Sequence, residues 1–319
     1  MKALICGVTG QDGSLLAKYL IEKNYEVIGT SRDSSVSSFR NLKYLNIYDQ
    51  VTKISMALND FRSVFEVVKS HRPNEIYNLA GQTSVGLSFC QPVEAMESIT
   101  KSTLVLLEVI RLLDLSIKFY NAGSSECFGN MGKSPANEKT PFSPCSPYGV
   151  AKSSAYWLVK NYRKAYQLSA CTGILFNHES ELRNQRFVTQ KIVQTAWKIK
   201  QGKLDKLEIG DLSVYRDWGW AQEYVKGMWL MLQEDKFQDF VIATGKTYSL
   251  KSFIEKTFSF FDLNYEKYLE INDNFKRPSE IIYSYGDPSY AEKILGWKAH
   301  VTFDDLISKL CKKCVEFEE

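Results

Sequence analysis

The chain has 319 residues, of which 44% are hydrophobic and 24% charged, and its formal net charge is +3. This length allows a large buried core, and the composition is that of an ordinary soluble globular protein. The small net charge and the lack of a long basic block argue against nucleic acid as a partner, and no apolar run approaches the ~18 residues of a membrane helix, so no membrane partner is expected either.

The first half of the chain alternates short apolar strands with helices. We predict strands over residues 2–6, 25–30, 51–57, 75–79, 117–121 and 170–176. Helices are predicted from the first glycine turn to about residue 23, over 60–70, up to about 113, and over 147–166. Such alternation implies right-handed crossovers within one parallel sheet. The predicted fold class is therefore α/β, with a Rossmann-type doubly wound parallel sheet over residues 1–176.

A glycine-rich turn joins the first strand to the first helix. Its sequence is Gly7-Val8-Thr9-Gly10-Gln11-Asp12-Gly13. Glycines in this context let the backbone approach a pyrophosphate at the helix N-terminus. The spacing is G-x-x-G-x-x-G rather than G-x-G-x-x-G, and a strand-helix corner without a ligand has the same appearance. A later strand ends in Ala80-Gly81-Gln82-Thr83, and small residues at the carboxyl end of a parallel strand let a cofactor lie close.

The residues after the second strand decide which dinucleotide is favoured. They read Ser31-Arg32-Asp33-Ser34-Ser35. An arginine here accommodates a ribose 2′-phosphate, whereas an acidic residue binds the free 2′-hydroxyl. Arg32 and the hydroxyls therefore favour NADP over NAD, and Asp33 argues mildly the other way. A solvated surface charge is the alternative interpretation of Arg32.

Two pairs of reactive side chains follow the fifth strand. Ser124 and Glu126 are two residues apart at a strand end, and Tyr148 and Lys152 are four apart at the start of a helix. Each spacing places the two side chains on one face. An ammonium near a phenol should lower the phenol pKa from its usual ~10, and Glu126 supplies a second base. These groups are suited to moving a hydride and then eliminating water.

Residues 177–319 are expected to form mainly a smaller substrate-binding lobe, with strands from about 206–245 returning to the first domain. Helices are predicted over 188–201, 221–233, 250–261 and 302–317, and strands near 206–210, 239–243 and 281–284. A diphosphate substrate needs cations, and arginine can bind it through forked contacts. The candidate cations are Arg183, Arg186, Lys191, Arg216 and Arg277. Surface charge is the alternative for each one taken singly.

Cysteine usage and metal-ligand spacing give no metal site. The seven cysteines have no regular spacing, which indicates reduced thiols and a cytoplasmic protein rather than a disulfide framework. Cys311-Lys312-Lys313-Cys314 has the C-x-x-C form, but neither a second pair nor a nearby histidine completes a zinc site. A helix end is the simpler interpretation of this segment.

Together these motifs resemble the extended short-chain dehydrogenase/reductases, and within them the GDP-mannose 4,6-dehydratases. The resemblance covers nearly the whole chain. The Tyr148/Lys152 pair marks only the superfamily, whereas Phe176-Asn177-His178-Glu179-Ser180 is far more particular. Further matching runs are Ser146 to Lys152, Arg216 to Gly219 and Phe240 to Gly245.

The resemblance implies a redox-neutral reaction with tightly held NADP. Tyr148 would take the C4 hydroxyl proton while the hydride passes to NADP, Glu126 would remove the C5 proton and help expel water, and the hydride would return to C6. Ser124 would hydrogen-bond the C4 oxygen, and Lys152 would hold the nicotinamide ribose. The implied cofactor contacts are Gly7, Gly10, Gln11, Asp12, Gly13, Arg32, Ser34, Ser35, Leu79, Ala80, Lys152, His178 and Arg183. The implied substrate contacts are Ser84, Asn177, Lys191, Arg216, Arg277 and Glu280.

Several positions depart from the family pattern and leave alternatives open. Ser124 replaces a usual threonine, Met56-Ala57 replaces a Gly-Asp pair, and Glu181 and Asn184 replace a proline and a glycine. The substrate could therefore be another GDP-sugar, such as a GDP-heptose. An epimerase or reductase would not need the carboxylate of Glu126, and a non-catalytic NADP-binding protein would need none of these groups. The family forms homodimers or homotetramers, which the resemblance extends to this chain.

Overall fold

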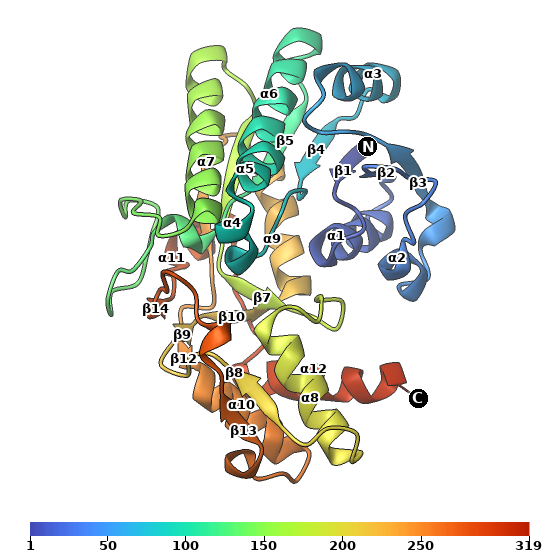
Figure 1. The fold of residues 1–319 in the computed structure, drawn as a ribbon. Coiled ribbons are helices and arrows are strands. Elements are labelled where there is room, and N and C mark those ends of the chain that lie inside the picture. Colours follow the sequence, from blue (N-terminus) through green and yellow to red (C-terminus); the bar gives the residue numbers. More distant parts are fainter. Residues whose placement is uncertain (319) are drawn as a thin grey trace.

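The computed structural model describes the backbone of residues 1–318 and the side chains of residues 1–316. A larger part holds a seven-stranded sheet between helices, and a smaller lobe lies at one end of it (Figure 1). Within residues 1–318, no helix is both long and apolar enough to cross a bilayer.

The large sheet is wholly parallel, with the strand order β11-β6-β5-β4-β1-β2-β3. Its strands are β1 (Lys2–Cys6), β2 (Glu26–Ser31), β3 (Val51–Ser55), β4 (Glu75–Asn78), β5 (Lys118–Ala122), β6 (Ala170–Leu175) and β11 (Phe240–Ile242). The order reverses between β1 and β4. In doubly wound sheets ligands bind outside the carboxyl ends of the strands at such a point. The predicted Rossmann-type fold is confirmed.

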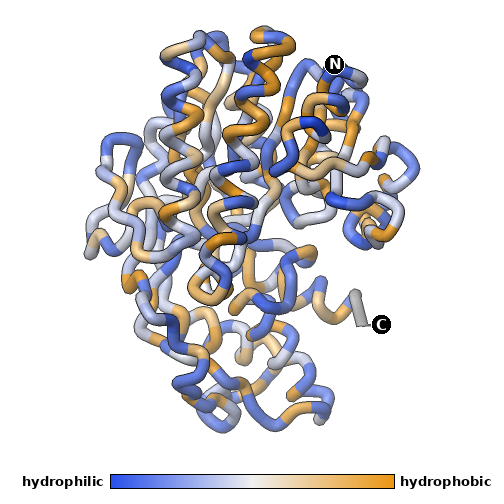
Figure 2. Tube along the Cα trace, turned by 45° about the horizontal axis from the view of Figure 1, so that its top comes forward, coloured by the Kyte–Doolittle hydropathy of each residue, from blue (hydrophilic) through white to orange (hydrophobic). Residues whose placement is uncertain are grey.

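Helices cover both faces of this sheet. One face carries α1 (Gln11–Glu22), α9 (Ala221–Gln233) and α11 (Ser289–Leu295), and the other carries α3 (Phe61–His71), α6 (Ser102–Leu113) and α7 (Pro147–Tyr166). In β1, Ala3 and Ile5 pack with the first group while Leu4 and Cys6 pack with the second. A strand buried on both faces has to be apolar throughout, which explains its sequence. Along the helices, hydrophobic and hydrophilic stretches alternate, as one buried face requires (Figure 2).

The helix expected to end near residue 113 is broken into four pieces. These are α4 (Val85–Cys90), α5 (Pro92–Ala95), a π-helical segment (Met96–Lys101) and α6. Pro92 has no backbone N–H and cannot continue α4, so it begins α5 instead. A short helix that the sequence did not predict, α2 (Arg40–Tyr44), precedes β3.

In the part of the chain that the structure describes, the smaller lobe contains three short sheets and three α-helices. The helices are α8 (Val188–Lys200), α10 (Leu250–Phe260) and α12 (Phe303–Glu318). The sheets pair β7 (Asn177–Glu179) with β10 (Trp218–Trp220), β8 (Leu207–Ile209) with β13 (Leu269–Ile271), and β9 (Tyr215–Arg216) with both β12 (Tyr248–Ser249) and β14 (Tyr283–Ser284).

The return of residues 206–245 to the large sheet is narrower than expected. Within residues 1–318, only β11 from this region joins that sheet. β8 instead pairs with β13, because Leu207 and Ile209 bury their side chains in the separate core of the lobe. The first domain therefore receives one later strand rather than several.

Candidate active site

The glycine turn forms a tight cradle at the carboxyl end of β1. Gly7 has a φ of +83°, and a Cβ there would lie 3.0 Å from the backbone of Ala80. A Cβ at Gly13 would lie 2.3 Å from the carbonyl oxygen of Gly7. Side chains are therefore excluded at both positions. The backbone N–H groups that begin α1 stay open toward an anionic ligand.

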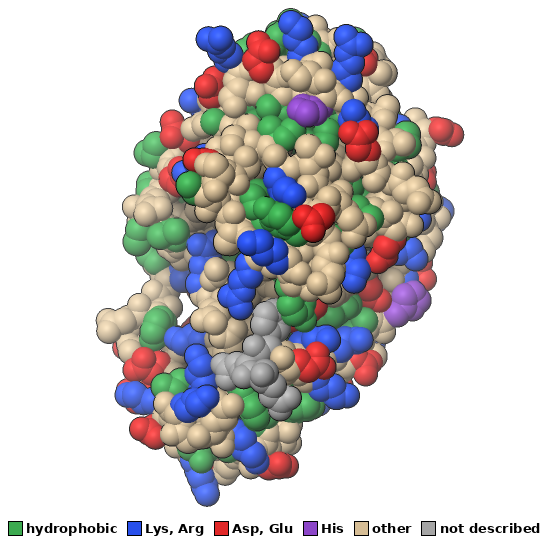
Figure 3. Space-filling view, turned by 90° about the vertical axis from the view of Figure 1, so that its right-hand side faces the viewer, with side chains coloured by type: hydrophobic (Ala, Val, Ile, Leu, Met, Phe, Trp, Pro, Cys, Tyr) green, Lys and Arg blue, Asp and Glu red, His purple; other side chains and the backbone are tan. Residues whose placement is uncertain are grey.

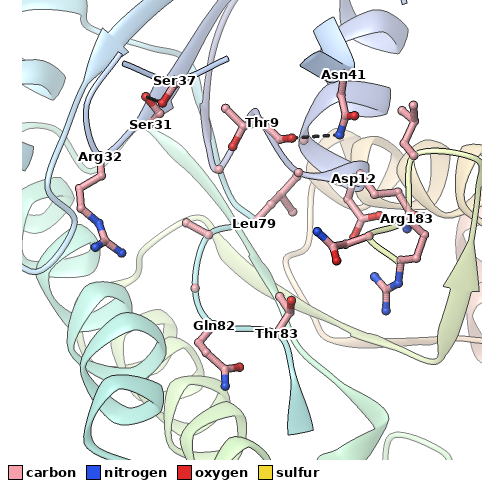
Figure 4. Close-up of a pocket in the computed structure, with 18 of the residues that line it drawn as sticks. Thr9, Asp12, Ser31, Arg32, Ser37, Asn41, Leu79, Gln82, Thr83 and Arg183 are labelled. Atoms are coloured by element: carbon pink, nitrogen blue, oxygen red, sulfur yellow. Dashed lines mark hydrogen bonds between the residues drawn. The ribbon is translucent and has the colours of Figure 1, made fainter. Parts of the chain in front are cut away.

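A cavity of about 1460 Å³ opens beside this turn. Typical small-ligand pockets measure roughly 300–1,000 Å³, so this one suits an extended ligand such as a dinucleotide. Figure 4 shows Arg32 and Arg183 on opposite sides of it, with Leu79 between them. Its lining includes nine of the expected cofactor residues: Gly7, Gly10, Gln11, Asp12, Gly13, Arg32, Leu79, Ala80 and Arg183.

The loop after β2 borders the cavity with a different set of hydroxyls from the one expected. Ser31 and Ser37 line the cavity and hydrogen-bond each other at 3.0 Å. Ser34 instead bonds Ser55, and Ser35 donates to the carboxylate of Asp33 at 2.6 Å. The hydrogen bonds from Ser35 lower the pKa of Asp33. The Asp33 carboxylate is thus engaged within its own turn while Arg32 extends beside it.

His178 joins the glycine turn to the smaller lobe. Its Nε2 lies 2.9 Å from Asp12 Oδ2, and its Nδ1 lies 2.7 Å from the carbonyl oxygen of Phe176. Burial alone would lower the pKa of His178 and raise that of Asp12. Their mutual attraction outweighs it, so the pKa of His178 is raised and that of Asp12 falls to about 2. Both ring nitrogens face acceptors, which favours the charged imidazolium.

The predicted hydroxyl, phenol and ammonium meet in a buried cluster. Ser124 and Tyr148 are each 8% exposed, Lys152 is 7% exposed, and the hydroxyl of Ser124 hydrogen-bonds Tyr148. Lys152 Nζ donates to the carbonyl of Ala122 at 2.7 Å and lies 5.8 Å from the Tyr148 ring centroid. Helix α7 carries both Tyr148 and Lys152, and it begins with Ser146 as its N-cap and Pro147 in its first turn.

The expected lowering of the Tyr148 pKa is wrong for the chain without ligands. Burial raises the pKa of Tyr148, and this exceeds the opposing effect of its hydrogen bond with Ser124. Burial also lowers the pKa of Lys152 to about 8. Desolvation penalises the charged form of each group, and for Tyr148 it outweighs the interactions that favour the phenolate.

Glu126 lies between this cluster and a group of charged residues from the smaller lobe. Burial raises the pKa of Glu126, and the positive charges of Arg216 and Arg277 partly oppose this. Arg216 is 8% exposed and donates to Glu280 at 2.7 Å, and Arg277 donates to the same carboxylate oxygen at 3.2 Å. Two arginines that lie 90 and 151 positions further along the sequence therefore act on the carboxylate of Glu126.

Three other expected substrate residues lie in separate local settings. Lys191 on α8 has its Nζ 3.6 Å from the ring centroid of Phe275. Asn177 begins β7, and Ser84 caps α4 by accepting from the N–H of Leu87. Among the described residues, no hydrogen bond or ion pair joins these three to the Arg216 group, so their place in a substrate site remains a prediction.

Several residues at the cavity were not among the predicted cofactor contacts. Arg186 donates to Thr83 at 3.2 Å, and Asn41 donates to the carbonyl of Thr9 at 3.0 Å across the cavity wall (Figure 4). Lys and Arg side chains surround the hollow between the two parts of the molecule (Figure 3). Arg186 was noted only as one cation among several. The α2 residues carried no motif that could have identified them.

The parallel sheet, the cradle and the Ser124–Tyr148–Lys152 cluster together define an extended short-chain dehydrogenase/reductase. The GDP-mannose 4,6 dehydratase family model matches residues 4–310. The chain belongs to the GDP-mannose 4,6-dehydratase family.

Individual proteins agree with this placement. GDP-mannose 4,6 dehydratase 1 of Arabidopsis thaliana is 41% identical over 98% of this chain and 90% of its own length. The human GDP-mannose 4,6 dehydratase is 39% identical over 98% of this chain and 91% of its own length. The structure of dTDP-glucose 4,6-dehydratase from Bacillus anthracis in complex with NAD has a TM-score of 0.86 at 18% identity, covering 100% of this chain and 97% of that one. This last similarity concerns the fold alone.

The residues around the cavity fit a nicotinamide dinucleotide, as the family implies. The glycine cradle leaves room for the backbone to approach a pyrophosphate, and Arg32 and Arg183 place positive charge at two ends of the cavity. Among the described residues, no group of three or more His, Cys, Asp or Glu could hold a metal ion.

Proposed function

We propose that this chain converts GDP-D-mannose to GDP-4-keto-6-deoxy-D-mannose and water. The observation that carries the proposal is the position of Glu126, a half-buried carboxylate whose charge interacts both with Tyr148 and with the Arg216–Glu280–Arg277 group. An epimerase or reductase of this fold has no step that needs such a base. A nucleotide-binding protein without activity has no use for it either.

The proposed cofactor is NADP. When bound, the dinucleotide supplies a hydride acceptor and donor, so that the hydrogen removed from C4 can be returned at C6. Gln11 and Asp12 at the start of α1 would hold the pyrophosphate region, and Arg32 would bind the 2′-phosphate. Lys152, beside Tyr148, would hold the nicotinamide ribose. The similar B. anthracis structure holds NAD, so the preference for NADP rests on Arg32 and on the engaged state of Asp33.

Tyr148 is proposed to take the proton of the C4 hydroxyl. Its hydrogen bond with Ser124 orients the phenol and gives the C4 oxygen a second partner. Burial makes the phenolate costly in the free chain, so the positive charge of Lys152 is needed nearby when the proton moves.

Glu126 is proposed to take the C5 proton and then protonate the departing C6 hydroxyl. Oxidation at C4 acidifies C5, which makes a carboxylate a sufficient base. Burial raises the pKa of Glu126, which makes its carboxylate a stronger base toward the C5 proton. A pKa nearer the working pH also allows the same group to pass that proton on to the leaving C6 oxygen. One residue can therefore serve both halves of the elimination.

We also propose that the chain forms a homodimer or homotetramer in which the loop after β2 meets a neighbouring subunit. The supporting observation is that Arg32, Val36, Ser37 and Arg40 all border the cofactor cavity while Val36 is 79% exposed. Sedimentation of the protein with bound NADP would reveal the oligomer, and a stable monomer would contradict it.

The direct test incubates the purified protein with NADP and GDP-mannose and examines the nucleotide-sugar by mass spectrometry and NMR. The expected product has lost one water, with no net formation of NADPH. Retention of NADP with unchanged GDP-mannose would contradict the proposed substrate. Other GDP-sugars, including a GDP-heptose, and then CDP- and dTDP-sugars would be tried next, because the Glu181 and Asn184 replacements lie at the cavity.

A further inference from the structure

Asp217 is a fully buried carboxylate that the proposed reaction does not use. It is 0% exposed and follows Arg216 directly, between β9 and β10. Its Oδ1 accepts from the backbone N–H of Thr244 at 2.9 Å and from the hydroxyl of Thr244 at 2.7 Å. Its Oδ2 accepts from the N–H of Gly245 at 3.0 Å and, more weakly, from that of Gly286 at 3.4 Å.

These donors come from two loops that belong to different parts of the molecule. Thr244 and Gly245 follow β11, the last strand of the large sheet, whereas Gly286 follows β14 of the small three-stranded sheet. The backbone N–H of Asp217 also donates to the carbonyl of Ser284 at 2.9 Å. One carboxylate therefore joins the edge of the large sheet to the sheet that carries Arg216.

The joint is closely packed around these hydrogen bonds. A Cβ at Gly286 would lie 2.7 Å from the Cβ of Ala243 and 2.8 Å from the ring of Phe176. The loops therefore have little room to move apart or together. A change at Asp217 would be transmitted along β9 rather than absorbed locally.

Retaining a carboxylate here is costly. Burial raises the pKa of Asp217 to about 6, although all four hydrogen bonds favour the charged form. These four donors are neutral, so none of them supplies the countercharge that a buried anion prefers. Packing alone could be achieved with an apolar side chain at lower cost. The carboxylate is explained better by the geometry that it fixes.

That geometry concerns Arg216. The backbone of Arg216 pairs with Tyr248 on one side and Ser284 on the other, and its guanidinium donates to Ile281 O at 2.7 Å and to Glu280. The direction of this side chain toward Glu126 depends on where β9 lies relative to the large sheet. Asp217 fixes that relation one residue away.

We propose that Asp217 is a positioning residue of the nucleotide-sugar site. It holds β9 against the end of β11, so that Arg216 presents its positive charge to the diphosphate at a fixed distance from the catalytic groups. This inference rests on the proposed function, because it assumes that Arg216 binds the diphosphate of the substrate.

The test is Asp217→Asn, which keeps the volume but presents an NH2 group where N–H donors point. Misplacement of a binding group by about 1 Å can cost about 100-fold, so we expect GDP affinity to fall about 10- to 100-fold. The KM for GDP-mannose should rise similarly while kcat changes less than about threefold, because the substrate and the transition state lose the same contact. The dissociation constant for NADP should not change.

Asp239→Asn is the matched control. Asp239, which directly precedes β11, is also a buried carboxylate and is 8% exposed. It accepts hydrogen bonds from Arg163 and from the backbone N–H of Thr172. Its replacement should lower the melting temperature without weakening GDP binding. If Asp217→Asn does not fold, Thr244→Val removes one of the four hydrogen bonds and should weaken GDP binding about threefold, the effect of a single neutral hydrogen bond.

The outcomes separate this inference from the proposed function. Wild-type protein that binds NADP but not GDP would overturn both. Wild-type binding of GDP, with Asp217→Asn or Thr244→Val lowering only the melting temperature, would overturn the inference alone. Equal losses of GDP and NADP affinity would also overturn it, because they would indicate a general structural role.

Discussion

The two halves of the active site are built differently. The dinucleotide half is an open cavity whose floor is backbone: glycines and strand ends leave N–H groups unobstructed, and Arg32 and Arg183 stand at its sides. In the half proposed to bind the nucleotide-sugar, polar side chains already interact with one another. Arg216 and Arg277 share Glu280, and Ser124 holds Tyr148.

This contrast indicates what each half must do when its ligand arrives. The backbone of the cradle needs no rearrangement, because its conformation is fixed by the close approach of Gly7 and Ala80. In the other half, the diphosphate of the proposed substrate would have to take Arg216 and Arg277 away from Glu280. The two arginines would then exchange one set of charge-assisted hydrogen bonds for another and gain none. Such an exchange favours specificity for the substrate more than high affinity for it.

The largest effect is expected from Glu126→Gln. The amide keeps the size of the side chain but cannot take the C5 proton, and a positioned general base typically contributes about 10²- to 10⁴-fold. We expect kcat for GDP-mannose dehydration to fall by about 10³-fold or more. The KM should change little, because Arg216 and Arg277 still bind the substrate. Product formation followed by mass spectrometry measures both.

Glu138→Gln is the control for that substitution. Burial raises the pKa of Glu138 as it does that of Glu126. Glu138, however, accepts a hydrogen bond at 2.7 Å from the backbone N–H of Val241 in the edge strand β11. Its replacement should leave kcat nearly intact. Wild-type turnover by Glu126→Gln would reduce Glu126 to a structural acid and would favour an epimerase or reductase.

The sequence was sufficient to predict the large sheet and the pairs of site residues that are close together along the chain. The period of the strands, the glycine turn and the four-residue spacing of Tyr148 and Lys152 each rest on local geometry. Contacts over long separations were not predictable in this way. His178 meets Asp12 across 166 residues, and the hydroxyls at the cavity are Ser31 and Ser37, because Ser35 is taken by Asp33. The sign of the Tyr148 pKa shift was missed because burial is a tertiary property.

A smaller effect tests the open half. Arg32→Ala removes the side chain proposed to bind the 2′-phosphate, and a hydrogen bond to a charged group contributes about 1.5–3 kcal/mol. We expect the dissociation constant for NADP to rise about 10- to 100-fold, while that for NAD stays within about threefold. Titration calorimetry with both dinucleotides measures the difference. Arg62→Ala, on the exposed start of α3, is the control. Equal weakening of both dinucleotides would contradict the assignment of Arg32.

The smallest effect concerns the link between the halves, the ion pair of His178 with Asp12. The pKa of His178 is raised by this pair, so its contribution to stability is complete below the ordinary value of 6.5 and is lost as the pH rises through the raised value. The pKa of Asp12 is lowered from 3.8 to about 2, so its contribution is present above 3.8 and is lost as the pH falls toward 2. The two pKa shifts describe one ion pair, whose contribution to stability is fully present between about pH 4 and 6.5.

From the lowered pKa of Asp12, the pair contributes about 2 kcal/mol to the free energy of unfolding. His178→Asn should therefore lower this free energy most near pH 6, and the deficit should shrink as the pH rises through the raised value. Urea unfolding at a series of pH values measures it, and His300→Asn, at an exposed position, should show no such trend. A deficit that stays constant with pH would mean that His178 is neutral and acts only through packing on Tyr224, whose ring lies 4.5 Å away. The link between the halves would then be apolar, and cofactor binding would not depend on the charge at Asp12.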